Sequence, residues 1–324
     1  MQKEKVIIIG GGPCGMSAAI ELKKLGINPL IIEKGNVVNT IHNFPTHQTF
    51  FSSSEKLELG DMAFINEKQK PVRIQALSYY REVAKRMKLR MNTYERAISI
   101  SKSADDIQVS TKLLNGETRS YIASELIIAT GYYDQPNTMN IPGEDKSKVM
   151  HYFKEGHPYY DKDVVVIGGK NSAVDAALEL HRAGAHVTVL YRGGEYSKSI
   201  KPWIIPEFKS LVNKGIINMI FHAQVVEIKD DKVIYNASGQ ETSLKNDFVF
   251  AMTGYRPDYT LLIDAGIQID KENGKPDYNP NTYETNVDGI YIAGVVAAGY
   301  NNNEIFIENG RFHGEAIAKS IHKG

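Results

Sequence analysis

The sequence predicts an α/β protein with two Rossmann-like dinucleotide-binding domains, one inserted in the other. Two stretches, starting at Val6 and Val164, carry the prediction, because each has the pattern of a buried strand, a glycine-rich turn and a helix. Two further apolar strands end in glycine turns at 125–131 and 247–254, where the chain is expected to leave and re-enter a domain. We therefore expect a discontinuous outer domain of residues 1–130 and 256–324 and an inserted domain of residues 131–255.

The first stretch contains the complete pattern of a dinucleotide-binding turn. Four β-branched residues, Val6–Ile9, predict a buried parallel strand, and Gly10-x-Gly12-x-x-Gly15 follows directly. Gly10 permits the tight turn, Gly12 lets the backbone approach a pyrophosphate, and Gly15 lets the helix pack on the strand. The helix N-terminus offers free N–H groups to phosphate. Glu33 ends the next strand, where it is expected to accept hydrogen bonds from ribose hydroxyls.

The second stretch, Val164–Leu180, departs from the first at two places. Lys170 stands where the middle glycine is expected, which indicates either a degenerate turn that binds nothing or a lysine that faces a phosphate. Where the first stretch has Glu33, the second has Arg192, with Lys198 further on. Because a carboxylate repels a 2′-phosphate and a guanidinium binds it, this pattern favours NADPH over NADH. An ordinary solvated arginine is the alternative.

Composition argues against several classes of function. Equal numbers of basic residues (38 Lys and Arg) and acidic residues (38 Asp and Glu) argue against a general binder of nucleic acid or anionic membranes. The chain has no apolar run long enough to span a bilayer and no leader before the first strand, so we expect a cytoplasmic protein. The single cysteine, Cys14, excludes an intrachain disulfide and a cysteine-rich metal site, and we expect no metal.

Four motifs give the whole chain a resemblance to a known superfamily. They are Gly10–Gly15 with Glu33, Ala129-Thr130-Gly131, Gly168–Ala173 and Ile292-Ala293-Gly294. With these motifs the chain resembles the two-dinucleotide-binding flavoproteins, and most of all the low-molecular-weight thioredoxin reductases. The resemblance implies that the outer domain binds FAD and the inserted domain binds NADPH. It also implies hydride transfer from the nicotinamide to the flavin, and a homodimer.

The same resemblance assigns residues to the two cofactors. For FAD it implies Gly10, Gly12, Pro13, Cys14, Gly15, Glu33, Lys34, Thr40, His47, Thr49, Ala97, Thr130, Gly131, Gly294, Val295, Glu304 and Ile305. For NADPH it implies Gly168, Gly169, Lys170, Asn171, Ser172, Ala173, Tyr191, Arg192 and Lys198. A closing helix expected over 305–321 would point its N-terminus at the flavin and stabilise negative charge on the reduced ring. Val295 departs from the family pattern, which usually has an aspartate there to hold the ribityl chain.

The chain lacks the dithiol of the thioredoxin reductases. Those proteins carry Cys-x-x-Cys just ahead of the second glycine turn, where this chain has His151–Tyr160 without any sulfur. Electrons therefore cannot pass through an internal disulfide. This absence, together with Gly11–Gly15 and Gly168–Ala173, resembles the bacillithiol disulfide reductases. The resemblance implies an NADPH-dependent FAD enzyme that reduces a small-molecule substrate, the oxidised dimer of a low-molecular-weight thiol.

Cys14 has two interpretations. As a redox thiol it would attack the substrate disulfide and form a mixed disulfide, and a helix N-terminus favours the thiolate. As a packing residue it is a small side chain at a tight strand–helix junction, where a bound pyrophosphate would raise its pKa. The resemblance makes Cys14 the candidate catalytic residue, and both interpretations stay open.

Four other residues also have two interpretations. By resemblance, His47 and Thr49 are expected beside the flavin ring, and ordinary hydrogen bonds within a loop are the alternative. Arg311 and His313 are expected either to face the substrate, whose carboxylates attract cations, or to form a solvated helix face.

Three rival functions stay open. A flavin-dependent monooxygenase is suggested by the aromatic residues of 151–160, although Phe153-Lys154-Glu155 lacks the glycine of that group's Phe-x-Gly fingerprint. A ferredoxin or flavodoxin–NADP reductase shares the fold and would need a basic docking surface, which the neutral net charge does not reveal. A non-catalytic nucleotide sensor is supported by Lys170. Bleaching of the flavin by NADPH separates the enzymes from the sensor.

Overall fold

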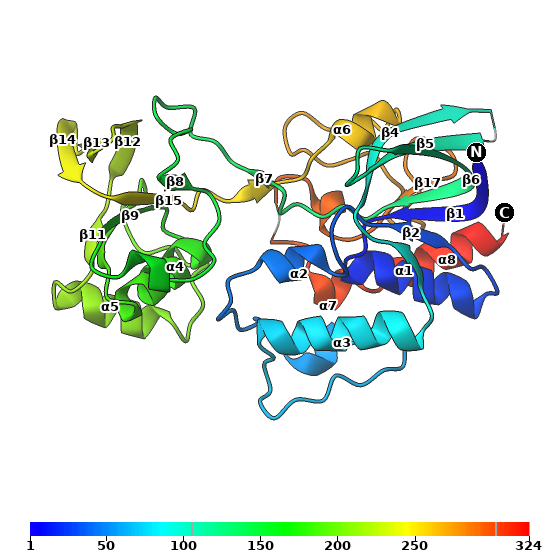
Figure 1. Ribbon diagram of the computed structural model, residues 1–324, viewed down its shortest axis with the longest axis horizontal. Coiled ribbons are helices and arrows are strands. Elements are labelled where there is room, and N and C mark those ends of the chain that lie inside the picture. Colours follow the sequence, from blue (N-terminus) through cyan, green and yellow to red (C-terminus); the bar gives the residue numbers. More distant parts are fainter. Residues whose placement is uncertain (105, 302, 324) are drawn as a thin grey trace. The chain divides into compact units, whose positions relative to one another are not determined.

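The computed structural model describes residues 1–104, 106–301 and 303–323. Its chain divides into two compact units, and the second interrupts the sequence of the first (Figure 1). The first unit comprises Met1–Asn43, Gln48–Gln135 and Arg256–Gly324. The second comprises Phe44–His47 and Pro136–Tyr255. The main crossings therefore follow residues 135 and 255, whereas the sequence placed them after 130 and 255.

The first unit is built on a sheet with the strand order β3-β2-β1-β6-β5-β4, in which β17 also pairs with β6. Strands β3, β2, β1, β6 and β17 pair in parallel, and β4 and β5 form antiparallel pairs beside β6. The strands are β1 (Gln2–Ile9), β2 (Leu30–Ile32), β3 (Arg90–Asn92), β4 (Glu95–Ser103), β5 (Asp106–Leu113), β6 (Thr118–Ile128) and β17 (Ile290–Ile292).

Both faces of β1 are covered, which explains its run of β-branched residues. Successive side chains of a strand point to opposite faces. Val6 and Ile8 pack with residues of α1 (Pro13–Lys24) and α8 (His313–Lys323). Ile7 and Ile9 pack with residues of β4, β5 and α6 (Thr260–Asp264). The glycine turn at the end of β1 therefore starts from the buried half of the strand, Val6–Ile9.

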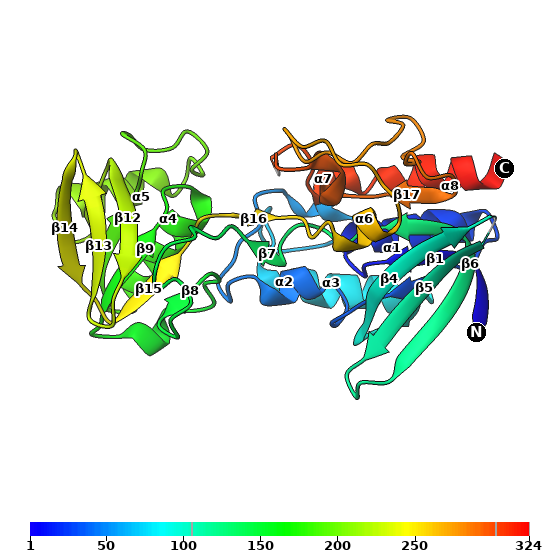
Figure 2. The ribbon, with the colours of Figure 1, turned by 90° about the horizontal axis from the view of Figure 1, so that it is seen from above.

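The second unit has a parallel sheet in the order β11-β10-β9-β15-β8. Helices α4 (Asn171–Arg182) and α5 (Ile205–Asn213) contribute to the core on one face, where Val164 and Val166 pack. An antiparallel sheet covers the other face, where Val165 and Ile167 pack (Figure 2). The strands are β8 (Val149–Met150), β9 (Asp163–Ile167), β10 (His186–Leu190), β11 (Asn218–Ile220), β12 (Ala223–Ile228), β13 (Lys232–Ala237), β14 (Gln240–Lys245) and β15 (Phe248–Ala251).

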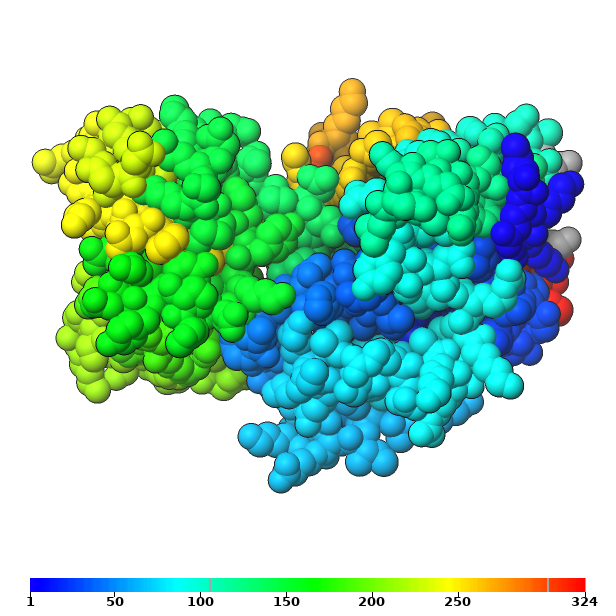
Figure 3. Space-filling model, in the orientation of Figure 1, coloured from blue at the N-terminus to red at the C-terminus, as the bar shows by residue number. Residues whose placement is uncertain are grey.

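The remaining elements lie in the connections. α3 (Arg73–Arg86) buries Tyr80, while its outer side, with Ile74, lies at the surface (Figure 3). β7 (Gln135–Pro136) and β16 (Tyr255–Arg256) pair where the chain passes from one unit to the other. The short helices are α2 (Asn39–Asn43), α7 (Ile307–Gly310) and the 3-10 segments Ser54–Leu57, His157–Tyr159 and Val295–Ala298.

The closing helix expected over 305–321 is interrupted: residues 307–310 and 313–323 are helical, and residues 311–312 form a turn. α7 is a single turn, and α8 begins after a break at Arg311. Ser17 Oγ donates to the carbonyl oxygen of Arg311 at 2.5 Å and so takes an acceptor that a continuous helix would use. Gly314 lies so close to α1 that an added Cβ would be 2.6 Å from Ala18 Cα. The break therefore depends on contacts with α1, which no local sequence pattern predicts.

Candidate functional site

The first glycine turn is closed on its protein side and open on the other. Gly10 has a φ of +115°, and an added Cβ there would lie 2.3 Å from the carbonyl oxygen of Ala129. A Cβ at Gly15 would lie 2.0 Å from the carbonyl oxygen of Gly10. At Gly12, by contrast, a Cβ would meet nothing within 4 Å. Only glycine fits at the two closed positions, and the backbone at Gly12 is accessible to a ligand.

Helix α1 begins at this open position without a capping side chain. Gly12 is the N-cap, Pro13 is the first helical residue, and the first turn contains no acid. The first N–H groups of a helix have no acceptor within the helix, and the helix dipole adds partial positive charge there. A phosphate group would satisfy both the donors and the dipole. The residues of this turn therefore fit the pyrophosphate of FAD.

The carboxylate of Glu33 is fixed against the same turn. It is 6% exposed and accepts the N–H groups of Gly11 at 2.7 Å and Gly35 at 2.8 Å. Burial raises the pKa of Glu33, and the two N–H donors and Lys34 oppose that rise. Each carboxylate oxygen keeps a further lone pair that a ribose hydroxyl can use. Lys34 itself forms an ion pair with Asp134.

A second turn, Ala129–Gly131, lies beside Gly10. The hydroxyl of Thr130 is buried and has no hydrogen-bond partner within the described part of the chain. Gly131 has a φ of +76°, and an added Cβ would meet nothing within 4 Å. Buried polar atoms are rarely left unpaired in folded proteins. The orphaned hydroxyl next to open backbone therefore also fits a polar ligand at this edge of the sheet.

The other residues predicted for FAD lie on several elements of the chain. Thr49 bridges to Val72 in the first unit, whereas His47 belongs to the second unit. Glu304 is exposed and pairs with Lys275 at 2.8 Å. The partly or fully buried residues Thr40, Ala97, Val295 and Ile305 lie in α2, in β4, in the 3-10 segment after Gly294 and just before α7.

The side chain of Cys14 fills a slot between two glycines of the first unit. A Cβ added at Gly294 would lie 2.9 Å from Cys14 Sγ, and one added at Gly310 would lie 3.0 Å from it. Although the residue as a whole is partly exposed, burial raises the pKa of the Cys14 thiol from 9.0 to about 12. With this pKa the thiol is protonated at neutral pH, because burial disfavours the charged thiolate.

His313 lies behind this slot. It is 6% exposed, its Nδ1 accepts the N–H of Gly294 at 3.2 Å, and its ring stacks on Tyr283 with the centroids 4.1 Å apart. Burial lowers the pKa of His313 to about 4, so the neutral ring accepts this hydrogen bond at neutral pH. Arg311 donates to two backbone carbonyl oxygens of segment 55–58, at 3.0 and 2.7 Å. The expectation of a solvated helix face is therefore wrong for His313.

The second glycine turn repeats part of the first. Gly168 has a φ of +137°, and an added Cβ would lie 2.5 Å from the carbonyl oxygen of Met252. Lys170 is the N-cap of α4 and is exposed. The ring of Tyr191 covers Gly169, where an added Cβ would lie 2.3 Å from the ring. The second turn thus keeps a glycine, Gly168, at the position where a side chain would clash. Lys170 provides a positive charge where α4 begins.

The other residues predicted for NADPH differ in accessibility. Ser172, Arg192 and Lys198 are exposed, whereas Ala173 is buried in the core. The sequence did not predict that the amide of Asn171 binds the segment around Lys198 through two hydrogen bonds. It also missed the glycine slot around Cys14 and the hydrogen bond to His313. Each of these contacts joins residues far apart in the chain, so no local motif reveals them.

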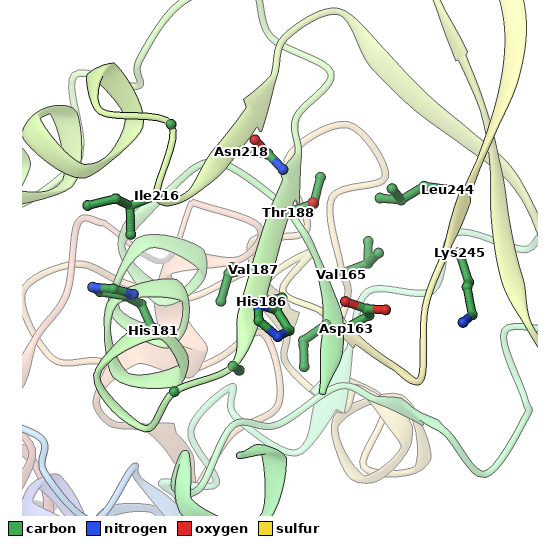
Figure 4. A pocket seen from close by; sticks show the side chains of 14 residues that line it. Asp163, Val165, His181, His186, Val187, Thr188, Ile216, Asn218, Leu244 and Lys245 are labelled. Carbon is green, nitrogen blue, oxygen red and sulfur yellow. The ribbon is translucent and has the colours of Figure 1, made fainter. Parts of the chain in front are cut away.

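A pocket of about 610 Å³ lies elsewhere in the second unit (Figure 4). Asp163 and His186, the first residues of β9 and β10, line it together with His181, Asn218 and Lys245. It therefore lies at the edge of the sheet opposite the glycine turn, away from the proposed nucleotide site. Among the described residues, no group of three or more His, Cys, Asp or Glu side chains could hold a metal ion. No described helix has the length and apolar character needed to cross a membrane.

Comparisons with known proteins agree with this geometry. Residues 7–294 match the family described as pyridine nucleotide-disulphide oxidoreductase. The chain is 63% identical to the bacilliredoxin reductase Bdr of Bacillus subtilis, over 100% of this chain and 99% of that protein. Solved structures of the bacillithiol disulfide reductase Bdr from Bacillus cereus and Staphylococcus aureus are 62% and 57% identical to it, with TM-scores of 0.98 and 0.95. Each alignment covers 99% of this chain, and 99% and 98% of the respective structure.

These similarities confirm the predicted fold class and the resemblance to the bacillithiol disulfide reductases. They confirm that the chain is an enzyme, a disulfide oxidoreductase that depends on FAD and NADPH. The chain thus belongs to the pyridine nucleotide-disulphide oxidoreductase family.

Proposed function

We propose that this enzyme uses NADPH to reduce bacillithiol disulfide to two molecules of bacillithiol. The observation that carries the proposal is full-length identity of 62–63% to proteins named bacillithiol disulfide reductase and bacilliredoxin reductase. The missing Cys-x-x-Cys ahead of Gly168 supports a small disulfide as the substrate. One NADPH and one proton are consumed for each disulfide, and NADP⁺ and two thiols are formed, so the electrons balance without a protein disulfide.

The proposed FAD site is the open side of the first glycine turn. The free N–H groups of α1 bind the pyrophosphate beside Gly12, and Glu33 accepts a ribose hydroxyl. The unpaired hydroxyl of Thr130 supports a polar contact at the neighbouring turn. The other proposed contacts are Gly10, Pro13, Cys14, Gly15, Lys34, Thr40, His47, Thr49, Ala97, Gly131, Gly294, Val295, Glu304 and Ile305.

The proposed NADPH site is the start of α4, at Gly168–Ala173. There Lys170 and the first N–H groups of the helix face the pyrophosphate, and Tyr191 lies beside the adenosine. Arg192 and Lys198 bind the 2′-phosphate. The support is that all three basic side chains are exposed and that no acid ends β10 to repel this phosphate. The proposed NADPH domain is residues 131–255, and the proposed FAD domain is residues 1–130 and 256–324; the first compact unit extends five residues further, to Gln135.

The chain's residues supply binding, orientation and charge. FAD held at this site would supply the redox chemistry that carries two electrons from NADPH to the disulfide. His313 holds the backbone of Gly294 in place, and Gly294 in turn confines Cys14. We retain Cys14 as the candidate catalytic thiol. For attack on a disulfide, its Sγ must lose a proton, form a mixed disulfide and release one thiolate, and two electrons must then release the second thiolate.

Replacement of Cys14 separates this covalent route from direct reduction of the substrate. In Cys14→Ala, the covalent route predicts that NADPH oxidation driven by bacillithiol disulfide falls to background, while NADPH still bleaches the flavin. Cys14→Ser is the matched control, because it preserves the size of the side chain in the glycine slot. Turnover at the wild-type rate in both variants would refute the covalent route and leave direct reduction.

One set of measurements tests the function against its rivals. Anaerobic mixing with NADPH must bleach the flavin, since an unbleached flavin would leave only a nucleotide sensor. Bleached enzyme is then offered bacillithiol disulfide, cystine, glutathione disulfide or ferredoxin. Preferred reoxidation by bacillithiol disulfide supports the proposal, and preferred reduction of ferredoxin supports a ferredoxin reductase. Hydroxylated product together with oxygen consumption would establish a monooxygenase.

A second candidate substrate comes from a relative's name. The relative in Bacillus subtilis is called a bacilliredoxin reductase. A bacilliredoxin that carries a bacillithiol mixed disulfide contains the same kind of S–S bond as the small substrate. Comparison of NADPH oxidation with that protein and with free bacillithiol disulfide, at equal disulfide concentrations, decides which substrate is used faster.

We further propose a homodimer in the cytoplasm. The family resemblance supports the dimer, and a single cysteine together with dependence on NADPH is compatible with a reducing compartment. Light scattering during size-exclusion chromatography measures the assembly, and a mass equal to that of one chain would refute the dimer. Cell fractionation followed by immunoblotting tests the location.

A further inference from the structure

Both polar atoms of the Asn171 side-chain amide form hydrogen bonds with the segment 197–201. Asn171 is the first residue of α4, directly after the second glycine turn. Its Nδ2 donates to the carbonyl oxygen of Ser199 at 2.7 Å, and its Oδ1 accepts the N–H of Lys201 at 2.8 Å. This pair of hydrogen bonds holds the segment 197–201 against the start of the helix. The side chain of Asn171 is therefore engaged with protein rather than free for a nucleotide.

The same segment is attached to α4 at a second point. Lys201 Nζ lies 2.8 Å from Asp175 Oδ2, and the two side chains are only 11% and 17% exposed. Ile200, beside this lysine, is 6% exposed and packs in the core with residues of α4. Asp175 neutralises Lys201, so this lysine is not the cation that would meet a phosphate.

Lys198 is the exposed cation that this attachment positions. It lies between Ser197 and Ser199, whose hydroxyl oxygens are 2.8 Å apart. Asn171 fixes the backbone directly after it through the carbonyl oxygen of Ser199. Arg192, which follows β10, is exposed as well. Glu195 is the one acid in the sequence between the two cations, so basic charge prevails in this connection.

We propose that Asn171 is a positioning residue for nucleotide specificity, which holds Lys198 within reach of a 2′-phosphate bound after β10, beside Arg192. The proposal rests on the proposed binding of NADPH at Gly168–Ala173. A mobile lysine loses conformational entropy when it binds a phosphate, and this loss weakens binding. Asn171 reduces the loss because it has already fixed the adjoining backbone. It acts through Lys198 and does not itself touch the phosphate.

The test compares two nucleotides on the flavin-loaded protein by isothermal titration calorimetry. Adenosine 2′,5′-bisphosphate carries the 2′-phosphate, and adenosine 5′-monophosphate lacks it, so the ratio of their dissociation constants isolates that group. In Asn171→Ala we expect this preference to fall on the order of tenfold, the value of one charge-assisted hydrogen bond. Lys198→Ala should lose a similar factor. The double variant should lose no more than Lys198→Ala alone, because the two residues act in series.

Two further variants serve as controls. Asn246 is a matched asparagine in the same unit: it is 2% exposed, donates to the carbonyl oxygen of Phe248 and accepts from Lys148, each at 3.2 Å. It precedes β15, at the edge opposite the glycine turn, so Asn246→Ala should lower the melting temperature and leave the preference unchanged. Asp175→Asn removes the negative charge that pairs with Lys201, with almost no change in shape, and so weakens the second attachment of segment 197–201. It should reduce the preference by a smaller factor, which keeps the proposal testable if Asn171→Ala fails to fold.

Specific results would overturn the proposal. An unchanged preference in folded Asn171→Ala would do so, and so would a loss in the double variant equal to the product of the two single losses. If Asn171→Ala does not fold, the proposal requires that Asp175→Asn has a lower preference for the 2′-phosphate than the wild type. Equal preferences in these two proteins would then refute it. Failure of the proposed function gives a different result. In that case NADPH would not reduce the flavin of the wild-type enzyme, or the reduced enzyme would not reduce disulfides, whatever the ratio of the two nucleotide dissociation constants.

Discussion

Alkylation of Cys14 measures how strongly its surroundings suppress the thiolate. Burial raises the pKa of this thiol from 9.0 to about 12. A shift of about three pKa units corresponds to roughly 4 kcal/mol against the charged form. At pH 7, about one thiol in 10⁵ is then ionised, against about one in 10² for an ordinary cysteine. Because the thiolate is the reactive species, we expect iodoacetamide to modify Cys14 about 10³ times more slowly than free cysteine.

The single cysteine of the chain makes the assay simple. Flavin-loaded protein is incubated with iodoacetamide between pH 7 and pH 10, and intact mass gives the modified fraction. The rate should keep rising over this whole range, since the pKa lies above it. Protein unfolded in guanidinium should react at the rate of free cysteine, and Cys14→Ala should not react. A plateau that begins near pH 8, or modification of the folded protein as fast as the unfolded protein, would refute the reasoning.

Three further predictions concern stability and flavin binding. Glu125 has a pKa raised to about 7, first by burial and then by Glu284 and Asp288. The folded state therefore binds this proton more tightly than the unfolded state, and stability falls as pH rises from about 4.5 to 7. The free energy of unfolding of Glu125→Gln, measured in urea, should exceed that of the wild type by about 1–3 kcal/mol at pH 8 and by little at pH 4.5. His313→Asn keeps an acceptor for the Gly294 N–H, whereas His313→Phe leaves that donor unpaired at a cost of about 1–3 kcal/mol. The asparagine variant should therefore retain more FAD, and the fluorescence of released flavin measures the amount lost by each variant. Gly15→Ala should abolish flavin incorporation, because its Cβ would lie 2.0 Å from a carbonyl oxygen. Gly12→Ala should fold with an unchanged melting temperature, because a Cβ there meets no protein atom within 4 Å, and it should bind FAD on the order of tenfold more weakly.

Each of these predictions has an outcome that contradicts it. Equal pH dependence of unfolding in wild type and Glu125→Gln would show that this carboxyl is not the group that titrates. Tighter flavin binding by His313→Phe than by His313→Asn would assign the role of the ring to stacking on Tyr283. A normal flavin content in Gly15→Ala would show that the turn can open.

Local patterns were sufficient to predict the turns that organise both units. The run Val6–Ile9 specifies a strand buried on both faces, and Gly10 and Gly15 occupy positions where a Cβ would strike a carbonyl oxygen. The clash at Gly15 is with Gly10, five residues earlier, and the φ of +115° at Gly10 is a property of its own backbone, so the motif contains both constraints. The same holds for Gly168, whose φ of +137° favours glycine. The contact of Gly10 with Ala129 joins distant segments and is not visible in the motif.

Contacts between distant segments were beyond local patterns. The closing helix breaks because Ser17 takes the carbonyl oxygen of Arg311, and the amphipathic pattern of residues 305–321 contains no sign of that partner. Nor does sequence spacing show that Phe44–His47 belongs to the second unit, where the N–H of Thr46 donates to the carbonyl oxygen of Lys154 at 2.9 Å. Asn171 has a typical place at the start of a helix. Its role depends on hydrogen bonds to Ser199 and Lys201, which lie in the connection after β10.

The surroundings of Cys14 restrict how its thiol could react. The imidazole of His313 is bonded to Gly294, which confines Cys14 Sγ, but its Nδ1 lone pair already accepts the Gly294 N–H. With a pKa of about 4, that imidazole is also a poor proton acceptor for a thiol whose pKa is about 12. A pyrophosphate at the start of α1 would further disfavour the thiolate, because it neutralises the same helix dipole. A covalent route through Cys14 therefore requires that the disulfide substrate, or a rearrangement around Gly294, brings a proton acceptor to Sγ. Direct reduction of the disulfide requires neither.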